Sequence, residues 1–381
     1  LDHIISQVLD IAPETSDILF VPGKTLQAEV YGLLTDVKLN PDLGPLLPFQ
    51  TEAVALCLMG QNMRVYRDFV QHGSADLSYQ LSGRARFRVN VFNQRGSISI
   101  VMRQLSTTVP TMEQLSLPKM FQEMAKEKFG MILVTGGTGS GKSTSLAALI
   151  DRINELFPVH IVTLEDPVEY LHPHKQGTVN QRELGVDFDE FSSGLRSALR
   201  QAPKVILVGE IRDRETVEIA MSAAETGHLV LGTLHTSDAG QTINRIIGMF
   251  ELSEELLVRT RLAESLKFVV GQRLLPKIGG GRVAAFELMR VNLRVKDLIV
   301  NGETEDKNYY GVIETSSAHG MVTFDQFIYD LFEGNRITEE TAMLTGTDKA
   351  KLGQMIDKLK ASRGEKVTDI EGLEFDTDYG G

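Results

Sequence analysis

From about residue 121 onward, short apolar runs alternate with stretches of helical periodicity. The runs are MILVT (131–135), HIVTL (160–164), KVILVG (204–209) and HLVLGTL (228–234). Each is mostly apolar and rich in β-branched residues, which is typical of parallel strands buried on both faces. Because helical stretches separate the runs, the pattern predicts a doubly wound α/β core over residues 119–291.

The first 105 residues show a different pattern and predict a small α+β domain. Residues 1–11 have the periodicity of a short amphipathic helix, and Gln50–Phe69 is also helical in period. Residues 75–105 alternate apolar and polar positions, as half-buried strands do, with a turn predicted at Asn93–Gly96. Residues 106–118 contain Thr and Pro without periodicity, so we interpret them as a linker.

The C-terminal third is expected to be largely helical. The pattern predicts a long helix or helix pair over residues 251–275 and a helical region over 292–362. Residues 363–381 are acidic and lack periodicity, so we expect a mobile tail.

Composition narrows the function classes. The chain has 381 residues, a net charge of −12 and a pI near 5.3, which disfavours nucleic acid as the main partner. The single cysteine, Cys57, excludes a disulfide framework and is expected to be a small buried apolar residue. No apolar run approaches the ~20 residues of a membrane span, and the N-terminal helix does not resemble a signal peptide. The first residue is not Met, so we expect a trimmed start, and we expect a cytoplasmic protein.

Residues 136–143, GGTGSGKS, fit the phosphate-loop pattern G-x4-G-K-[ST], between a predicted strand and a predicted helix. Glycines allow backbone N–H groups to surround an anion at a helix N-terminus. Lys142 would reach the β- and γ-phosphates of a nucleotide, and the Ser143 hydroxyl would bind Mg²⁺. For Thr144, the alternative to binding nucleotide is that it only caps the helix or packs against its neighbours. The residues expected to bind nucleotide are Gly137, Thr138, Gly139, Ser140, Gly141, Lys142, Ser143 and Thr144.

Two carboxylates follow predicted strands. Glu210 ends the run at 204–209, where most phosphate-loop ATPases have an aspartate that helps to hold magnesium; here Gly209 precedes the glutamate. At the carboxyl edge of the sheet Glu210 would orient the attacking water, and the alternative is an ion pair with Arg212 or Arg214. Glu165 follows the preceding run and should reach the same edge. We expect Mg²⁺ to be held by Ser143, nucleotide oxygens and waters, with both glutamates acting through water.

Histidines and arginines supply further candidates. His235 follows a predicted strand and His228 begins it; either imidazole could sense the γ-phosphate, and the alternative for both is a structural role. A metal role for the pair is not expected. Phosphoryl transfer also gains from an arginine on the γ-phosphate. Basic residues on strands usually form a solvated face, but they can also reach a neighbour's nucleotide. The arginines considered are Arg196, Arg200, Arg212 and Arg214 in the core, and Arg84, Arg86, Arg88, Arg95 and Arg103 in the N-terminal domain.

Five segments occur in the order of a known family. They are RFRVNVFNQRG with VMRQL (86–105), GGTGSGKST (136–144), TLEDPVEY (163–170), LVGEIRD (207–213) and GHLVLGTLHT (227–236). Together they resemble the type IV pilus retraction ATPases, the PilT/PilU branch of the secretion-type ATPase superfamily, over about residues 76–354.

The resemblance implies a PAS-like N-terminal domain, a RecA-like P-loop ATPase core and a ring-shaped homohexamer that binds ATP and Mg²⁺ between these domains. It implies that Glu210 is the catalytic glutamate, Glu165 the Asp-box acid, and His228 and His235 the His-box residues. Arg88 and Arg103 match arginines that are directed towards the phosphates. Hydrolysis would drive domain rotation against an inner-membrane platform protein, at the cytoplasmic face of that membrane, to retract the pilus in twitching motility.

Three departures keep alternatives open. Ser16–Phe20 lacks a histidine of the family pattern, Arg294–Ile299 diverges from the retraction signature AIRNLI, and the acidic tail resembles that of PilU-like paralogues. The chain could therefore be an accessory ATPase that retracts only with a paralogue. A pilus-assembly or type II secretion ATPase is disfavoured by the single cysteine and short N-terminal domain. A regulatory ring is disfavoured by Lys142, Ser143 and Glu210, and a nucleic-acid motor by the acidic balance.

Overall fold

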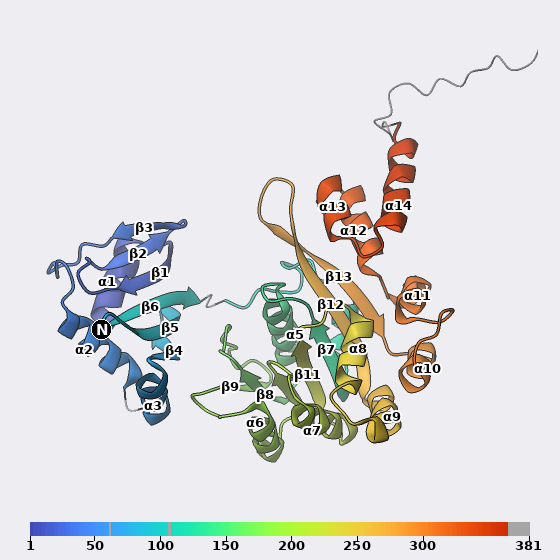
Figure 1. Cartoon of the computed structure of the whole chain (residues 1–381), viewed down its shortest axis with the longest axis horizontal. Helices are drawn as coiled ribbons and strands as arrows, with labels where there is room; N and C mark the ends of the chain where they lie inside the picture. The colour runs from blue at the N-terminus through green and yellow to red at the C-terminus, as the bar shows by residue number, and fades with distance from the viewer. Residues whose placement is uncertain (61, 106–107, 365–381) are drawn as a thin grey trace, which may run out of the picture. The chain divides into compact units, whose positions relative to one another are not determined.

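The computed structural model describes residues 1–60, 62–105 and 108–364 (Figure 1). These residues form two compact units, one of residues 1–132 with 143–233, the other of 133–142 with the chain from 234 onward. The described part of the predicted linker, 108–118, contains no helix or strand. The predicted acidic tail lies outside the described residues from position 365 onward.

An antiparallel sheet with three helices forms the N-terminal part of the first unit, as the alternating pattern predicts. Its strand order is β3-β2-β1-β6-β5-β4. The strands are β1 (Thr15–Phe20), β2 (Gln27–Val30), β3 (Leu33–Asp36), β4 (Ser74–Leu81), β5 (Ala85–Gln94) and β6 (Ser97–Leu105). Apolar side chains from this sheet, such as Phe87 and Ile100, pack with Ile5 of helix α1 (Asp2–Ile11) and Ala55 of α2 (Pro48–Met59).

The helical segment predicted at Gln50–Phe69 is two helices. Helix α2 ends before Gly60, which has a φ of 53°, and α3 (Met63–His72) begins after Asn62, whose side chain accepts the Arg64 N–H at 3.1 Å. The expectation for Cys57 was wrong, because its side chain is exposed. The buried positions of α2 lie on the face that packs against β6, and Cys57 lies outside that face.

The turn predicted at Asn93–Gly96 is confirmed. Arg95 and Gly96 have φ values of 48° and 76°, the left-handed conformation of a two-residue hairpin between β5 and β6. The resulting register places Arg88 of β5 directly opposite Arg103 of β6.

The second sheet has seven strands in the order β13-β12-β7-β11-β10-β8-β9. The four predicted apolar runs are four of these strands, and β8, β10 and β11 pair in parallel. Strands β7, β10 and β11 are buried at every position, as expected for strands covered on both faces. The strands are β7 (Gly130–Thr135), β8 (His160–Glu165), β9 (Thr178–Glu183), β10 (Val205–Val208), β11 (Leu229–Leu234), β12 (Leu266–Pro276) and β13 (Arg282–Arg290).

Helices connect these strands. In Figure 1 the helix α5 follows β7, and α6 packs against β8 and β10. The connecting helices are α4 (Met120–Met124), α5 (Lys142–Leu156), α6 (Phe191–Ala198), α7 (Arg214–Glu225), α8 (Ala239–Ile247) and α9 (Glu255–Ser265). Among the described residues, no helix combines the length and apolar character needed to span a membrane.

The helix predicted over residues 251–275 is only half correct. Helix α9 ends at Ser265, and Leu266–Pro276 is strand β12, which forms a long antiparallel ladder with β13. The segment LKFVVGQRLL contains Phe268, Val269 and Val270, which favour a strand, and its pairing with β13 outweighs the helical period.

The helical prediction for the C-terminal region is confirmed. Arg273 of β12 lies over the Phe324 ring of α12, 3.8 Å from its centroid, and donates a hydrogen bond to Thr345 O at 2.7 Å. The helices are α10 (Leu293–Asn301), α11 (Tyr309–Glu314), α12 (Phe324–Glu333), α13 (Glu339–Thr345) and α14 (Lys349–Ser362).

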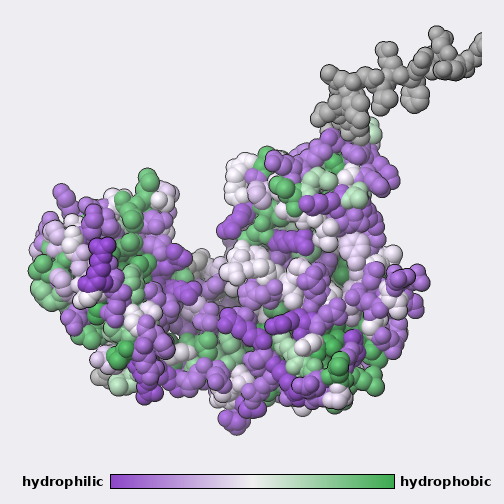
Figure 2. All heavy atoms as spheres, viewed as in Figure 1, coloured by the Kyte–Doolittle hydropathy of each residue, from purple (hydrophilic) through white to green (hydrophobic). Residues whose placement is uncertain are grey.

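Figure 2 shows mostly hydrophilic residues on the visible face of the protein, with apolar residues in smaller patches.

Candidate nucleotide site

The loop at residues 136–141 lies between strand β7 and helix α5, as predicted. Gly136, Gly139 and Gly141 have φ values of 148°, 75° and 89°, which side-chain-bearing residues rarely adopt. A Cβ atom at Gly136 would lie 2.3 Å from the main-chain oxygen of Gln272, and one at Gly141 would lie 2.8 Å from Gln272 Nε2. Glycine is therefore required at position 136 by close packing and by backbone conformation, and at position 141 by backbone conformation, with the end of the Gln272 side chain close beside it.

Lys142 is held inside this loop. Its ammonium group donates hydrogen bonds to the carbonyl oxygens of Gly136 at 2.7 Å and Gly137 at 3.1 Å. The residue is only 9% exposed. The first turn of α5, which begins at Lys142, thus presents a charged group and backbone N–H groups at the same end of the helix, an arrangement that binds anions.

The carboxyl ends of β8 and β10 carry the two predicted carboxylates at the same edge of the sheet. Leu164 pairs with Val208, and Gly209 N donates to Leu164 O at 2.7 Å, so Glu165 and Glu210 follow neighbouring strand ends. A Cβ at Gly209 would lie 2.8 Å from Leu164 O. The position before Glu210 therefore has no room for the aspartate expected in most phosphate-loop ATPases.

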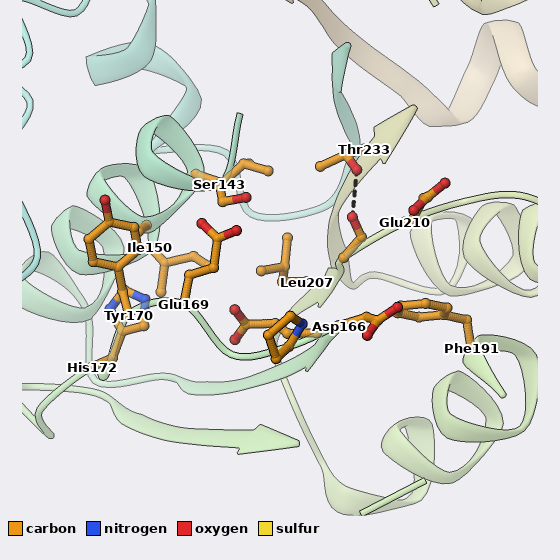
Figure 3. Close-up of a pocket in the computed structure, with 15 residues that line it drawn as sticks. Ser143, Ile150, Asp166, Glu169, Tyr170, His172, Phe191, Leu207, Glu210 and Thr233 are labelled. Atoms are coloured by element: carbon orange, nitrogen blue, oxygen red, sulfur yellow. Dashed lines mark hydrogen bonds between the residues drawn. The ribbon is translucent and has the colours of Figure 1, made fainter. Parts of the chain in front are cut away.

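One pocket collects these groups with the start of α5. Figure 3 shows it between α5 and the ends of β8 and β10. Its polar lining consists of His172 and of residues with hydroxyl or carboxylate oxygens, and such oxygens suit a hard cation such as Mg²⁺. The oxygen-bearing residues are Ser143, Glu165, Asp166, Glu169, Tyr170, Glu210 and Thr233.

Glu210 forms an ion pair, the alternative that the sequence left open. Arg212 Nη2 donates to Glu210 Oε2 at 2.6 Å, and Arg212 Nε contacts the other carboxylate oxygen. The hydrogen bond to Glu210 raises the pKa of Arg212. Thr233 fixes the same segment, since its hydroxyl donates to Gly209 O (dashed in Figure 3) and its carbonyl accepts Ile211 N–H at 2.9 Å.

Glu165 has a different environment. Burial raises the pKa of Glu165, while hydrogen bonds from Thr163 Oγ1 at 2.6 Å and Gln181 Nε2 at 3.0 Å act in the opposite direction. Gln181 also donates to Tyr170 O at 2.8 Å, so it holds both the carboxylate and the loop after β8. A carboxylate with a raised pKa is a stronger proton acceptor when ionised. No pattern in the sequence indicated Gln181, because strand β9 was not predicted.

Thr144 shows the packing role considered for it. Its hydroxyl lies 3.1 Å from the hydroxyl of Tyr170, whose ring lines the pocket.

The two histidines lie at opposite ends of strand β11. His235 directly follows the carboxyl end of the strand, as expected. His228 precedes the strand, and its Nδ1 lies 3.0 Å from Ala223 O. Because β10 and β11 are parallel and in register, His228 is at the edge of the sheet opposite to Glu210. His228 therefore lies away from the carboxylates, as its place at the start of the strand implies, and its role at the nucleotide stays a prediction.

Threonines link the strand before the phosphate loop to the segment after His235. Thr135, the last residue of β7, donates to Thr236 O at 2.6 Å. Thr236 Oγ1 lies 2.7 Å from Thr242 Oγ1 in helix α8, and Thr242 donates to Asp238 O at 2.7 Å. These hydroxyl contacts were not predicted, although Thr residues at the ends of predicted strands were an available signal for them.

Arg88 and Arg103 come together as a cross-strand pair on the N-terminal sheet. Both side chains are exposed, at 51% and 70%. Arg103 Nε bonds to Asp17 Oδ1 at 2.9 Å, and Arg88 Nε lies 4.0 Å from Asp76 Oδ1. Their action on phosphate stays a prediction.

The neighbouring Arg86 is buried instead. Its Nη2 bonds to Glu183 Oε2 of β9 at 2.8 Å, and Ser78 donates to both oxygens of Glu183 at 2.7 and 2.8 Å. Arg86 thus has a fixed partner on the second sheet.

These features define a class of protein. A glycine-rich loop between a buried parallel strand and a helix, with carboxylates at neighbouring strand ends, is the site of an α/β phosphate-loop ATPase. The family model described as "Type II/IV secretion system protein" matches residues 56–282, and the chain belongs to this family.

The chain is similar to pilus ATPases over most of its length. It is 44% identical over 313 residues to "Type IV pilus retractation ATPase PilT" of Pseudomonas aeruginosa, covering 82% of this chain and 88% of that protein. It is 37% identical over 363 residues to "Type IV pilus ATPase PilU" of the same organism, covering 95% and 93%. The crystal structure of the pilus retraction motor PilT with bound ADP has 41% identity and a TM-score of 0.82, covering 93% of this chain and 99% of that one.

These likenesses confirm the predicted resemblance, the fold class and the ATPase activity. The chain has the α/β secretion-ATPase fold, with an N-terminal domain, an ATPase core and a helical C-terminal region, and it binds nucleotide.

Proposed function

We propose that this chain is an ATP-hydrolysing motor that powers type IV pilus retraction. The observation that carries the proposal is the 44% identity to a pilus retraction ATPase, across 313 residues that include the nucleotide site. Lys142 and the loop glycines support nucleotide binding, and the presence of Glu210 in the same pocket as Ser143 favours turnover over a regulatory ring.

The phosphate loop would bind ATP through Gly137–Ser143, with Lys142 on the β- and γ-phosphates. Mg²⁺ would be held by the Ser143 hydroxyl, with Glu165 and Glu210 contributing through water; both carboxylates line the pocket that contains Ser143. When bound, the metal neutralises negative charge on the phosphate oxygens. Residues of the chain would hold the metal mostly through water, which suits the tendency of Mg²⁺ to keep several waters.

Glu210 would orient and polarise the attacking water. The hydrogen bond from Arg212 fixes the direction of this carboxylate. Glu165 is the alternative acid–base group, because burial raises its pKa. His235, directly after β11, would sense the γ-phosphate and pass its state to helix α8 through the Thr236–Thr242 contact. For His228, a structural role at the start of β11 is better supported within one subunit.

Arg88 and Arg103 would act on the phosphates of a nucleotide in a homohexameric ring. Both guanidinium groups are exposed, and Arg88 is the more available of the two, because its partner Asp76 is exposed and 4.0 Å away, whereas Arg103 is bonded to the buried Asp17 at 2.9 Å. The domain boundaries proposed for this motor are those predicted from the sequence: 1–105, 119–291 and 292–362, joined by the 106–118 linker. The motor would act from the cytoplasm on an inner-membrane platform protein.

A count of surface pili together with twitching motility, in the source organism lacking this gene, tests the proposal. We expect more pili and lost motility. Bald cells would contradict retraction and indicate pilus assembly.

A second candidate function is an accessory retraction ATPase that depends on a paralogue. It is favoured by the similarity to PilU over 95% of this chain and by the divergent Arg294–Ile299 in helix α10. Unchanged pilus number with partly weakened motility would support this candidate over the first.

A further inference from the structure

Gln272 lies against the phosphate loop from strand β12. It is 2% exposed, and no sequence motif singled it out. Its main-chain oxygen occupies the space beside Gly136, 2.3 Å from where a Cβ would lie. Its side-chain amide nitrogen occupies the space beside Gly141, 2.8 Å from where a Cβ would lie. One residue therefore contacts both ends of the loop that surrounds the phosphates.

Two buried polar atoms at this contact have no hydrogen-bond partner among the described residues. They are the amide oxygen of Gln272, Oε1, and the hydroxyl oxygen of Ser140. Ser140 is 7% exposed and belongs to the loop, and its Oγ would lie 2.7 Å from a Cβ placed on Gly136. Burying an unpaired polar group destabilises a folded protein, so such groups require an explanation.

The two unpaired groups are chemically complementary. A hydroxyl can donate a hydrogen bond, and an amide oxygen can accept one. Both lie at the wall of the same loop, whose glycines allow its backbone to shift. A phosphate that draws in the loop N–H groups would reposition the segment that carries Ser140.

We propose that Gln272 is a positioning residue for the nucleotide site, which accepts a hydrogen bond from the Ser140 hydroxyl when the loop holds phosphate. The bond stabilises the nucleotide-bound loop and removes two unpaired polar groups at the same time. Gln272 then contributes to nucleotide affinity without touching the nucleotide. The proposal concerns the nucleotide site alone and holds for a motor of either pilus function.

The test is ADP affinity of the full chain, measured by isothermal titration calorimetry for Gln272→Leu, Ser140→Ala and the double variant. We expect each single variant to bind ADP about tenfold more weakly, the scale of one hydrogen bond. The double variant should bind as the single variants do, because both remove the same bond. Without nucleotide, melting temperatures should be unchanged or higher, since an unpaired buried group has been removed.

Matched controls come from the N-terminal sheet. Ser99 Oγ and Gln104 Oε1 are also buried and unpaired among the described residues, but they lie on β6. Ser99→Ala and Gln104→Leu should leave ADP affinity unchanged.

Unchanged ADP affinity in either loop variant, or losses that multiply in the double variant, would overturn the pairing. A lowered melting temperature with wild-type affinity would show that Gln272 has only a structural role. If Gln272→Leu does not fold, Ser140→Ala still decides, because wild-type ADP affinity in that variant contradicts the proposal. ADP binding requires no pilus, so the result is independent of the retraction experiment.

Discussion

The phosphate loop and the arginine face of the N-terminal sheet, formed by Arg88 and Arg103, differ in how their charged groups are held. Lys142 is buried and bonded to two carbonyl groups of its own loop. The two arginines are exposed and pair with Asp76 and Asp17. The Arg88–Asp76 pair is exposed on both sides, and such pairs contribute only about 0–1 kcal/mol, so exchanging Asp76 for a phosphate costs little. Asp17 is buried, so releasing Arg103 from it costs more.

The difference separates two kinds of site. The phosphate loop is held by contacts within the chain, whereas the arginine face needs a bound phosphate to hold the Arg88 side chain. The loop's conformation follows from its own glycines and from Gln272 packed against it. Strand register places the two arginines side by side; Arg103 is bonded to Asp17, whereas Arg88 has only a distant contact with Asp76. Arg86 lies on the same strand as Arg88, but its side chain is buried and fixed by an ion pair with the buried Glu183. The predictions below test this division, beginning with the largest expected effect.

Lys142→Ala should abolish ATP hydrolysis and weaken nucleotide binding, since the ammonium is the positive charge within the loop. Phosphate release and ADP titration measure the two effects. Lys175→Ala, which removes an ammonium paired with Asp151 instead, is the control and should remain active. Wild-type turnover in Lys142→Ala would rule out the phosphate-loop interpretation.

Glu210→Gln should keep ATP binding and lose about 10²-fold or more in hydrolysis rate, the scale of a positioned acid–base group. Steady-state rates with parallel ATP titration separate the two quantities. Glu218→Gln removes a carboxylate on α7 that pairs with Arg214, and it should keep the wild-type rate. If Glu210→Gln retains turnover, Glu165 becomes the better candidate.

Arg88→Ala should reduce hydrolysis roughly tenfold, the scale of one charge-assisted hydrogen bond, because Arg103 remains beside it. Arg95→Ala removes an exposed arginine at the hairpin turn and should have no such effect. Mixing Arg88→Ala subunits with Glu210→Gln subunits sharpens the comparison. Recovered activity at mixed interfaces supports action between subunits; activity that stays at the sum of the two variants argues against it.

Glu287 should make stability depend on pH without affecting the arginine face. Burial raises its pKa from 4.5 to about 7, although it accepts the Ala239 N–H; Asp238 and Asp325 act in the same direction, and Arg273 opposes them. The unfolded chain therefore ionises Glu287 at lower pH than the folded protein does. The free energy of unfolding should fall by at most roughly 3 kcal/mol as the pH rises from about 4.5 to 7, and the loss should then level off.

Denaturant unfolding of Glu287→Gln at pH 5 and pH 8 measures this effect. Relative to the wild type, the variant should gain stability between the two pH values. Glu264→Gln, which changes an exposed carboxylate paired with Lys296, is the control and should show no gain. A stability difference independent of pH would mean that Glu287 ionises alike in both states.

Much of the fold and the central part of the site were predictable from local pattern. Buried parallel strands appear as apolar runs, and the phosphate loop requires glycines at fixed spacing, so β7, β8, β10, β11 and residues 136–143 were identified correctly. The hairpin at Arg95–Gly96 was likewise encoded in its turn residues. In these places, local backbone preferences and burial agree with the final structure.

Other features depend on contacts between distant segments. Residues 266–275 have an ambiguous pattern, and only the β13 partner makes them a strand. Cys57 lies in an apolar run but outside the packed face of α2. His228 and His235 are seven positions apart in sequence, yet strand β11 lies between them and places them at opposite edges of the sheet.

The sequence by itself determined the class of chemistry, because the phosphate loop and the carboxylates at strand ends are local patterns tied to one function. Only the tertiary structure decided which other groups support them. Gln181 reaches Glu165 from β9, and Gln272 reaches the loop from β12, 131 positions after Gly141 (272 − 141). The physical reason is that a side chain's partner is set by the packing of strands far apart in the chain, which no local pattern records.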